Sequence, residues 1–236
     1  MNICRLKPEF VEPLSLALFE EWHVHLRRGE EIYCESDAMV MMDNTLELRG
    51  KMQGGFMSAL VRRLANGESF FQQHIRAERG DGDCLLAPLM PGDLEILDIG
   101  KTQYNLNDGA YLAATSGVSL TARMQNIGSA LFAGTGGFLI GQTAGEGQLV
   151  VNGFGTLFTL DVTADNPVII DNGHVVAWDS RLHYEISVTT GNSRGLIGNL
   201  VNSVTSGEAV VLKFSGNGKV ILSSRTPTSF RAWAKA

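Results

Sequence analysis

Residues Gly145–Leu160 read GEGQLVVNGFGTLFTL. A Gly-Glu pair opens this stretch, an apolar run follows, Gly153 and Gly155 mark a turn, and a second apolar run returns. Short apolar runs that are rich in β-branched and aromatic residues and bounded by glycine are typical of strands. The stretch therefore predicts two strands joined by a tight turn.

The same order of features occurs at Gly67–Leu86 and at Gly207–Leu222. Both stretches begin with Gly-Glu, and both turn at a glycine-rich point, Gly80–Gly82 in one and Gly216–Gly218 in the other. Each then returns through an apolar run. We therefore expect the three stretches to be equivalent hairpins.

A second marker repeats with the first. Gly29, Gly109 and Gly173 each open another apolar run, and the spacing between successive copies changes in step with that of the hairpins. A long internal period with strand-turn-strand content indicates a few small β units. We predict an all-β fold of three β-sandwich-like repeats in a single domain. The predicted boundaries are residues 14–99, 102–162 and 167–224, followed by a C-terminal tail at 225–236.

The connectors inside the repeats are apolar, which is unusual for loops. Gly54–Asn66 has apolar residues at helical spacing and predicts a short helix near residues 55–65. Gly128–Ala144 and Gly191–Ser206 are the other two connectors. Together they could form one exposed patch that binds a protein partner, another copy of the chain or a membrane surface. The alternative is that they fold inward and cap the β units. The candidate interface residues are Phe56, Met57, Leu60, Phe132, Phe138 and Ile197.

Composition narrows the classes of function. The chain has 236 residues, with 19 basic and 25 acidic side chains and a net charge of −6, which argues against nucleic acid as a partner. Three widely spaced cysteines without a CxxC motif, and a start without a signal-like apolar segment, favour a cytoplasmic location. No run of 18 apolar residues is present, so we expect no membrane-spanning helix.

No motif in the sequence predicts a catalytic residue, a metal ligand set or a cofactor. His23 and His25 share one strand face, but no motif supplies the third ligand that a zinc site needs. The Gly-Glu pairs contribute the carboxylates of Glu68, Glu146 and Glu208, which threefold repetition would arrange as a ring. Such a ring could bind a cation. We favour the alternative, in which each carboxylate accepts hydrogen bonds in its own turn.

Several phrases together resemble the bacterial and mitochondrial family named for altered inheritance of mitochondria. The resemblance implies a β fold similar to the tryptophan RNA-binding attenuation protein, triplicated in one chain about a pseudo-threefold axis. It supplies no catalytic residues, and the mitochondrial relatives organise the inner membrane without a known reaction. The matching phrases are Gly67–Phe71, Ala87-Pro88 with Pro91–Asp93, Asp171–His174 with Val176–Trp178, Gly207-Glu208 and Arg225–Pro227.

These observations predict a non-enzymatic β scaffold that binds a protein partner or a membrane surface. Among partners, they favour another protein or a second copy of the chain. Peripheral contact with a membrane stays open. One alternative is a small-molecule or metal-binding protein, or an enzyme, with a pocket near the pseudo-threefold axis. Another is RNA binding by analogy of fold, but fold alone does not carry function, and the net charge of −6 opposes it.

Overall fold

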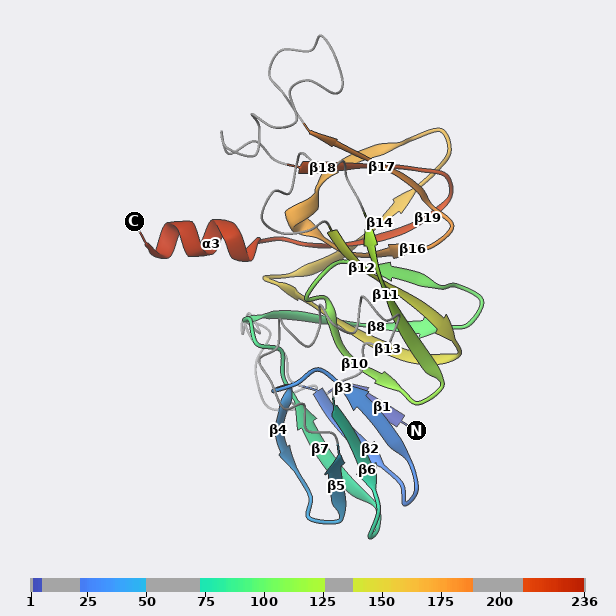
Figure 1. Ribbon diagram of the computed structural model, residues 1–236, viewed down its shortest axis with the longest axis vertical. Coiled ribbons are helices and arrows are strands. Elements are labelled where there is room, and N and C mark those ends of the chain that lie inside the picture. The colour runs from blue at the N-terminus through green and yellow to red at the C-terminus, as the bar shows by residue number, and fades with distance from the viewer. Residues whose placement is uncertain (1, 6–21, 50–72, 126–137, 189–209, 236) are drawn as a thin grey trace, which may run out of the picture.

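The computed structural model describes residues 2–5, 22–49, 73–125, 138–188 and 210–235. Most of these residues are in β-strands, arranged in four antiparallel sheets (Figure 1). Neighbouring sheets overlap along the long axis, since β5 and β6 of the second sheet lie at the lower end beside β2 and β7 of the first (Figure 1). This confirms the predicted all-β class. The helix predicted near residues 55–65 lies outside the described residues.

The first sheet lies at the lower end in Figure 1 and has the order β1-β2-β7-β4. Trp22, Val24 and Leu26 are buried on one face of β2, whereas His23 and His25 lie on the other. This alternation follows from the two-residue period of a strand. The strands are β1 (Asn2–Arg5), β2 (Trp22–Leu26), β7 (Gly82–Leu86) and β4 (Met39–Met42).

The two central sheets have six strands each. The second sheet has the order β5-β6-β3-β10-β13-β8. Its strands are β5 (Leu46–Arg49), β6 (Gln73–Ala77), β3 (Glu31–Cys34), β10 (Tyr111–Thr115), β13 (Gly147–Phe154) and β8 (Gly92–Ile99). The third has the order β11-β12-β9-β16-β19-β14. Its strands are β11 (Val118–Gln125), β12 (Phe138–Gly145), β9 (Tyr104–Leu106), β16 (Val175–Asp179), β19 (Gly218–Ser223) and β14 (Leu157–Val162).

The fourth sheet has three strands in the order β15-β18-β17 and lies at the upper end (Figure 1). Its strands are β15 (Val168–Asp171), β18 (Val210–Ser215) and β17 (His183–Val188). A 3₁₀ turn, η1 (Asn172–His174), follows β15, and one α-helix, α3 (Pro227–Ala234), follows β19.

Three clusters of buried side chains form the core, one after another along the molecule. The first contains Trp22 and Ile32. The second contains Leu106 and Leu149, and the third is built around Trp178. Burial of this apolar surface is the main term that stabilises such a fold, because apolar area removed from water contributes about 25 cal/mol per Å².

The three predicted hairpins do not form. The strands β6 and β7 of Gly67–Leu86 lie in different sheets, as do β18 and β19 of Gly207–Leu222. Gly145–Leu160 is not a hairpin either. Its first strand, β13, pairs with β8 and β10, and its second, β14, pairs with β19. The tight turn lies instead at Gly145, between β12 and β13, where φ is +91°. A Cβ atom at Gly153 would collide with the side chain of Leu157. Glycine at that position therefore serves close packing, which sequence alone does not distinguish from a turn.

The expected limits of the connector Gly128–Ala144 also change. Phe138 to Ala144, predicted as part of an apolar connector, belong to β12, which pairs with β11 along its whole length. Ile140 is buried in the third core. Residues 92–99, at the end of the predicted first repeat, form β8, which pairs with β13.

Candidate functional site

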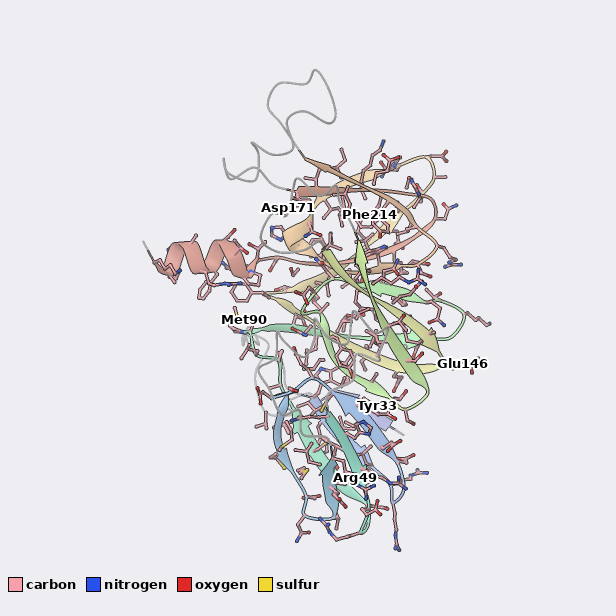
Figure 2. The ribbon with its side chains drawn as sticks, in the orientation of Figure 1. Tyr33, Arg49, Met90, Glu146, Asp171 and Phe214 are labelled. Carbon is pink, nitrogen blue, oxygen red and sulfur yellow. The ribbon has the colours of Figure 1, made fainter. Side chains whose placement is uncertain are left out.

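Most of the predicted site residues lie outside the described residues. These are Glu68, Glu208, Phe56, Met57, Leu60, Phe132 and Ile197. Phe138 is the first residue of β12 and pairs with Gln125. Glu146 is exposed at the β12–β13 turn, and its backbone N–H donates to the carbonyl oxygen of Gly117 at 3.0 Å (Figure 2).

The two histidines of β2 share one carboxylate. His23 Nε2 lies 3.0 Å, and His25 Nδ1 2.9 Å, from Oδ1 of Asp83 on the neighbouring strand β7. Among the described residues, no group of three His, Cys, Asp or Glu side chains is arranged to hold a metal ion. Here the histidines tie β2 to β7 on the exposed face of the first sheet.

Two cysteines are buried in the first core. Burial raises the pKa of the Cys34 thiol and of the Cys84 thiol to about 12 in each case. Because the thiolate is the reactive form, both residues are poor nucleophiles at neutral pH. They pack as small apolar side chains.

A pocket of about 550 Å³ lies where α3 leaves the β body. In Figure 1 the helix projects sideways from the end of β19. The pocket combines three aromatic rings with hydroxyl, imidazole and guanidinium groups. It is lined by Phe154, His174, Ser224, Arg225, Thr226, Ser229, Phe230 and Trp233.

Local sequence explains why a helix starts here. Thr226 is the N-cap, and its Oγ1 accepts a hydrogen bond from the backbone N–H of Ser229 at 3.1 Å. Pro227 follows at the first helical position, where its fixed φ suits a helix and its missing N–H costs no intrahelical bond. The phrase Thr-Pro-x-Ser therefore both ends the strand region and begins α3.

Contacts with the body hold the start of α3 in place. The rings of Phe154 and Phe230 meet edge to face, with centroids 5.1 Å apart. The backbone N–H of Arg225 donates to the carbonyl oxygen of Phe154 at 3.2 Å. Nδ1 of His174 lies 2.7 Å from the carbonyl oxygen of Ser223. The polar groups at the base of the pocket thus have structural partners.

The remainder of α3 is open to solvent. None of its residues is buried, and the side chain of Trp233 is 73% exposed. Arg225, Arg231 and Lys235 add positive charge, and no acidic residue follows Glu208 in the sequence. An apolar and basic surface therefore stands on a chain whose net charge is −6.

Sequence reasoning missed this site, because residues 225–236 show no strand pattern. A helix signal was nevertheless present: Thr226 and Pro227 form a helix start, and Phe230 and Trp233 follow at a spacing of three. No helix within the described part of the chain is long and apolar enough to cross a membrane.

One half-buried carboxyl, that of Glu35, lies apart from the pocket. Burial, together with the nearby charges of Asp108 and Asp37, raises the pKa of Glu35 to about 7. Partial desolvation also raises the pKa of Asp108, which lies at the surface. Perturbed carboxyl groups can mark active sites, but they also arise from packing alone. Here both side chains lie in turns that follow strands β3 and β9.

Known proteins are similar to this chain in sequence and in fold. The family model described as Mitochondrial biogenesis AIM24 matches residues 19–225. An uncharacterised protein of Streptococcus pyogenes serotype M6 is 34% identical over 220 residues, which cover 90% of this chain and 84% of that protein. The crystal structure of a Streptococcus pyogenes protein matches with a TM-score of 0.75 and 31% identity, covering 94% of this chain and 95% of the other. The chain therefore belongs to the Mitochondrial biogenesis AIM24 family.

Proposed function

We propose that this protein is a non-enzymatic β scaffold that binds a protein partner in the pocket beside α3. One observation carries the proposal: Trp233 is 73% exposed at the mouth of a pocket that Phe154 and Phe230 line. Exposed Trp and Arg beside a concave apolar surface are the side chains that most often dominate the energy of protein interfaces.

Charge defines the kind of partner. Arg225 lies at the pocket, Arg231 lies on the helix and Lys235 is its C-cap, and α3 itself carries no acidic side chain. A complementary segment would place an apolar side chain in the pocket and an acidic side chain against Arg225. Since a pocket of about 550 Å³ accepts an inserted side chain, its shape favours a peptide segment over a flat membrane surface.

A binding role fits the hydrogen bonds at the base of the pocket better than catalysis does. His174 is held by the carbonyl oxygen of Ser223, and Oγ of Ser224 accepts from the backbone N–H of Thr156 at 2.8 Å. Oγ1 of Thr226 caps the helix. These side chains hold α3 on the body, so the scaffold presents a preformed pocket, which lowers the entropic cost of binding.

We also infer that the scaffold is built of three six-stranded units, at residues 22–86, 92–154 and 157–223. The six strands of each unit are numbered in chain order. In every unit, the first and third strands pair with the sixth strand, and the second and fourth strands pair with the fifth strand. The pairs that support this scheme are β2–β7, β4–β7, β3–β6 and β5–β6; β8–β13, β10–β13, β9–β12 and β11–β12; and β14–β19, β16–β19, β15–β18 and β17–β18.

The test for the pocket is selection from a displayed peptide library on the full-length protein. We expect the selected peptides to combine an aromatic or aliphatic residue with Asp or Glu. Their binding should fall about tenfold or more in Trp233→Ala and in Arg225→Ala. A matched control is Phe158→Ala, which removes another exposed aromatic side chain, 51% exposed on β14.

Two results would overturn the proposal. Equal loss of peptide binding in Phe158→Ala and Trp233→Ala would show that binding is not specific to the pocket. If no peptide is selected, but vesicles containing an anionic phospholipid bind wild type and not Trp233→Ala, the site is a membrane-binding surface instead.

A further inference from the structure

The two outer sheets match the two halves of a central sheet. Each six-stranded sheet joins three strands of one unit to three strands of the next, through β3–β10 in the second sheet and β9–β16 in the third. The outer sheets, β1-β2-β7-β4 and β15-β18-β17, have no such joint within the described residues. The edge strand that corresponds to a joint strand is β4 in the first sheet and β15 in the fourth.

We propose that two copies of this protein associate end to end by pairing β4 of one copy with β15 of the other. The outer sheets would then complete one another, giving the order β17-β18-β15-β4-β7-β2-β1. Each central sheet has the fourth, fifth and second strands of one unit followed by the third, sixth and first strands of the next. The completed sheet has the same order, with β1 added beside β2. The proposal uses the strand scheme of the three units and does not depend on the pocket at α3.

β4 matches the strands that form the existing joints. Like β10 and β16, it is the third strand of its unit and pairs with the sixth. All three carry a shift of register at the same place. The shifts lie between Met39 and Met41, between Tyr111 and Ala113, and between Val175 and Ala177. Because a bulge fixes the register of a strand, it aligns Met41 with Ala113 and Ala177.

β15 matches the other side of each joint. β3, β9 and β15 are the second strands of their units and pair with the fifth. After β3, the backbone N–H of Glu35 donates to the carbonyl oxygen of Leu112 at 2.8 Å. After β9, that of Asn107 donates to Val176 at 2.9 Å. Asp171 holds the corresponding place after β15, so its N–H is expected to donate to Val40 of the second copy.

The existing joints also give the expected register. Cys34 faces Ala113 in one joint and Leu106 faces Ala177 in the other. By the same alignment, Ile170 would face Met41, Ile169 would face Met42, and Val168 would face Asp43. Pro167 precedes β15 and has no N–H, so the new ladder ends there.

Exposure of apolar side chains supports this assignment. Val40 is 54% exposed and Met41 49%, whereas their counterparts in the joints are 0–4% exposed. On the opposite edge, Ile169 is 67% exposed. Proteins usually protect sheet edges with charges or short irregular strands, and exposed apolar edges are prone to pair with another chain. The joint counterparts are Leu112 and Val176 for Val40, and Ala113 and Ala177 for Met41.

In the described part of the chain, the other edge strands have no equivalent strand that joins one unit to the next. β8 and β14, the first strands of their units, end their sheets, as do the fourth strands β5, β11 and β17. Within the described residues no such strand forms a ladder with a strand of a neighbouring unit, and Gly92 of β8 makes only an isolated bridge with Gly155. β4 and β15 are therefore the edges whose counterparts already join one unit to the next.

The partner is a second copy because the two edges are complementary and far apart. The first sheet, with β4, and the fourth sheet, with β15, lie at opposite ends of the long axis (Figure 1). Each copy thus offers one edge of each kind. Such a head-to-tail contact produces a closed ring or an open chain of subunits.

The test measures mass by light scattering after size-exclusion chromatography. Wild type should run as a multiple of the chain mass of 25.5 kDa. Ile169→Lys and Met41→Lys each place a charge on one edge, and each variant alone should be monomeric. Mixed together, they retain one compatible pair of edges, so they should form a species of two chains and nothing larger.

A matched control separates edge pairing from general stickiness. Phe158→Lys charges an exposed apolar site on β14 and should leave the mass of wild type unchanged. Thermal unfolding of each variant verifies that it is folded. A monomeric wild type at all concentrations, loss of assembly in Phe158→Lys, or assembly retained in both edge variants would overturn the proposal.

Discussion

The ring of Phe230 meets the ring of Phe154 edge to face, at 5.1 Å between centroids, and so joins α3 to the β body. Phe154 is 7% exposed and Phe230 39%. We expect Phe230→Ala to release the helix while changing the free energy of unfolding of the body by less than about 1 kcal/mol. Trypsin should then cleave faster after Arg231. Phe154→Ala, by contrast, should cost about 3 kcal/mol. An unchanged cleavage rate in Phe230→Ala would show that this contact does not hold α3.

Asp179 is expected to stabilise the turn after β16. Its buried carboxylate accepts from the backbone N–H of Arg181 at 2.9 Å and forms a 2.6 Å ion pair with the guanidinium. Burial raises the pKa of Asp179, but the hydrogen bonds from Arg181 outweigh it and lower the pKa overall. A lowered pKa stabilises the fold above the unfolded value near 3.8, and the contribution is lost as pH falls.

Asp179→Asn should therefore lower the free energy of unfolding at pH 7 by about 2 kcal/mol. The difference from wild type should shrink below about pH 4. Urea unfolding of wild type and Asp179→Asn, at pH 7 and below about pH 4, measures this difference in the free energy of unfolding. Asp161→Asn, which breaks an exposed pair with Lys219, is the control and should change little. A difference that stays constant down to low pH would contradict the role of the charge.

Glu35 should make the protein less stable as pH rises. Its pKa is raised from 4.5 to about 7, mainly by burial and then by Asp108 and Asp37. The folded state therefore holds a proton that the unfolded state has released between these values, so stability falls over that window. Glu35→Gln should remove this loss and stabilise the protein at pH 8 by about 1 kcal/mol, allowing for solvent screening. Asp165→Asn, at an exposed position, is the control. An unchanged slope in Glu35→Gln would assign the pH dependence to other groups.

Gly92 is expected to tolerate no side chain. It begins β8, and a Cβ atom there would overlap the backbone carbonyl of Gly153. Gly92→Ala should lower the free energy of unfolding by about 3 kcal/mol, because a close backbone contact cannot relax cheaply. Gly80→Ala is the matched control, since its new Cβ would lie 3.5 Å from Thr45, an ordinary contact. Equal stability of the two variants in thermal unfolding would contradict the packing assigned to Gly92.

The sequence was sufficient to predict the all-β class, because alternating and apolar runs separated by glycine report strands directly. It was not sufficient to place the hairpins. Gly145 and Gly153 look alike in sequence, yet one turns the chain and the other admits a close neighbour. Pairing of β14 with β19, about 60 residues away in sequence, depends on tertiary packing that no local pattern encodes.

The candidate site was less accessible to sequence reasoning. The residues first selected for an interface lie almost entirely outside the described part of the chain. The pocket instead depends on Phe154 and His174, which are far from α3 in sequence. The pairing of β16 with β19 places His174, whereas Phe154, at the end of β13, accepts a hydrogen bond from the backbone N–H of Arg225. Thr226 and Pro227 could have predicted the helix, but not what it packs against.

The same limit applies to the sheet edges. Exposure of Val40 and Met41 cannot be read from an apolar run, since the equivalent residues Leu112 and Ala113 are equally apolar and buried. What separates them is whether a neighbouring unit is present. The strand scheme of the three units shows this difference, and it makes pairing of β4 with β15 the central claim.

Hydrogen exchange measured at several protein concentrations tests that claim most directly. In the proposed ladder, the backbone N–H groups of Met42, Ile169 and Asp171 face the second copy. Their protection should rise with protein concentration in wild type, as expected for linked association, while the paired amides of β13 stay unchanged. In Met41→Lys the protection of Ile169 and Asp171 should be independent of concentration. Protection of the two edges that does not change with concentration in wild type would contradict the account.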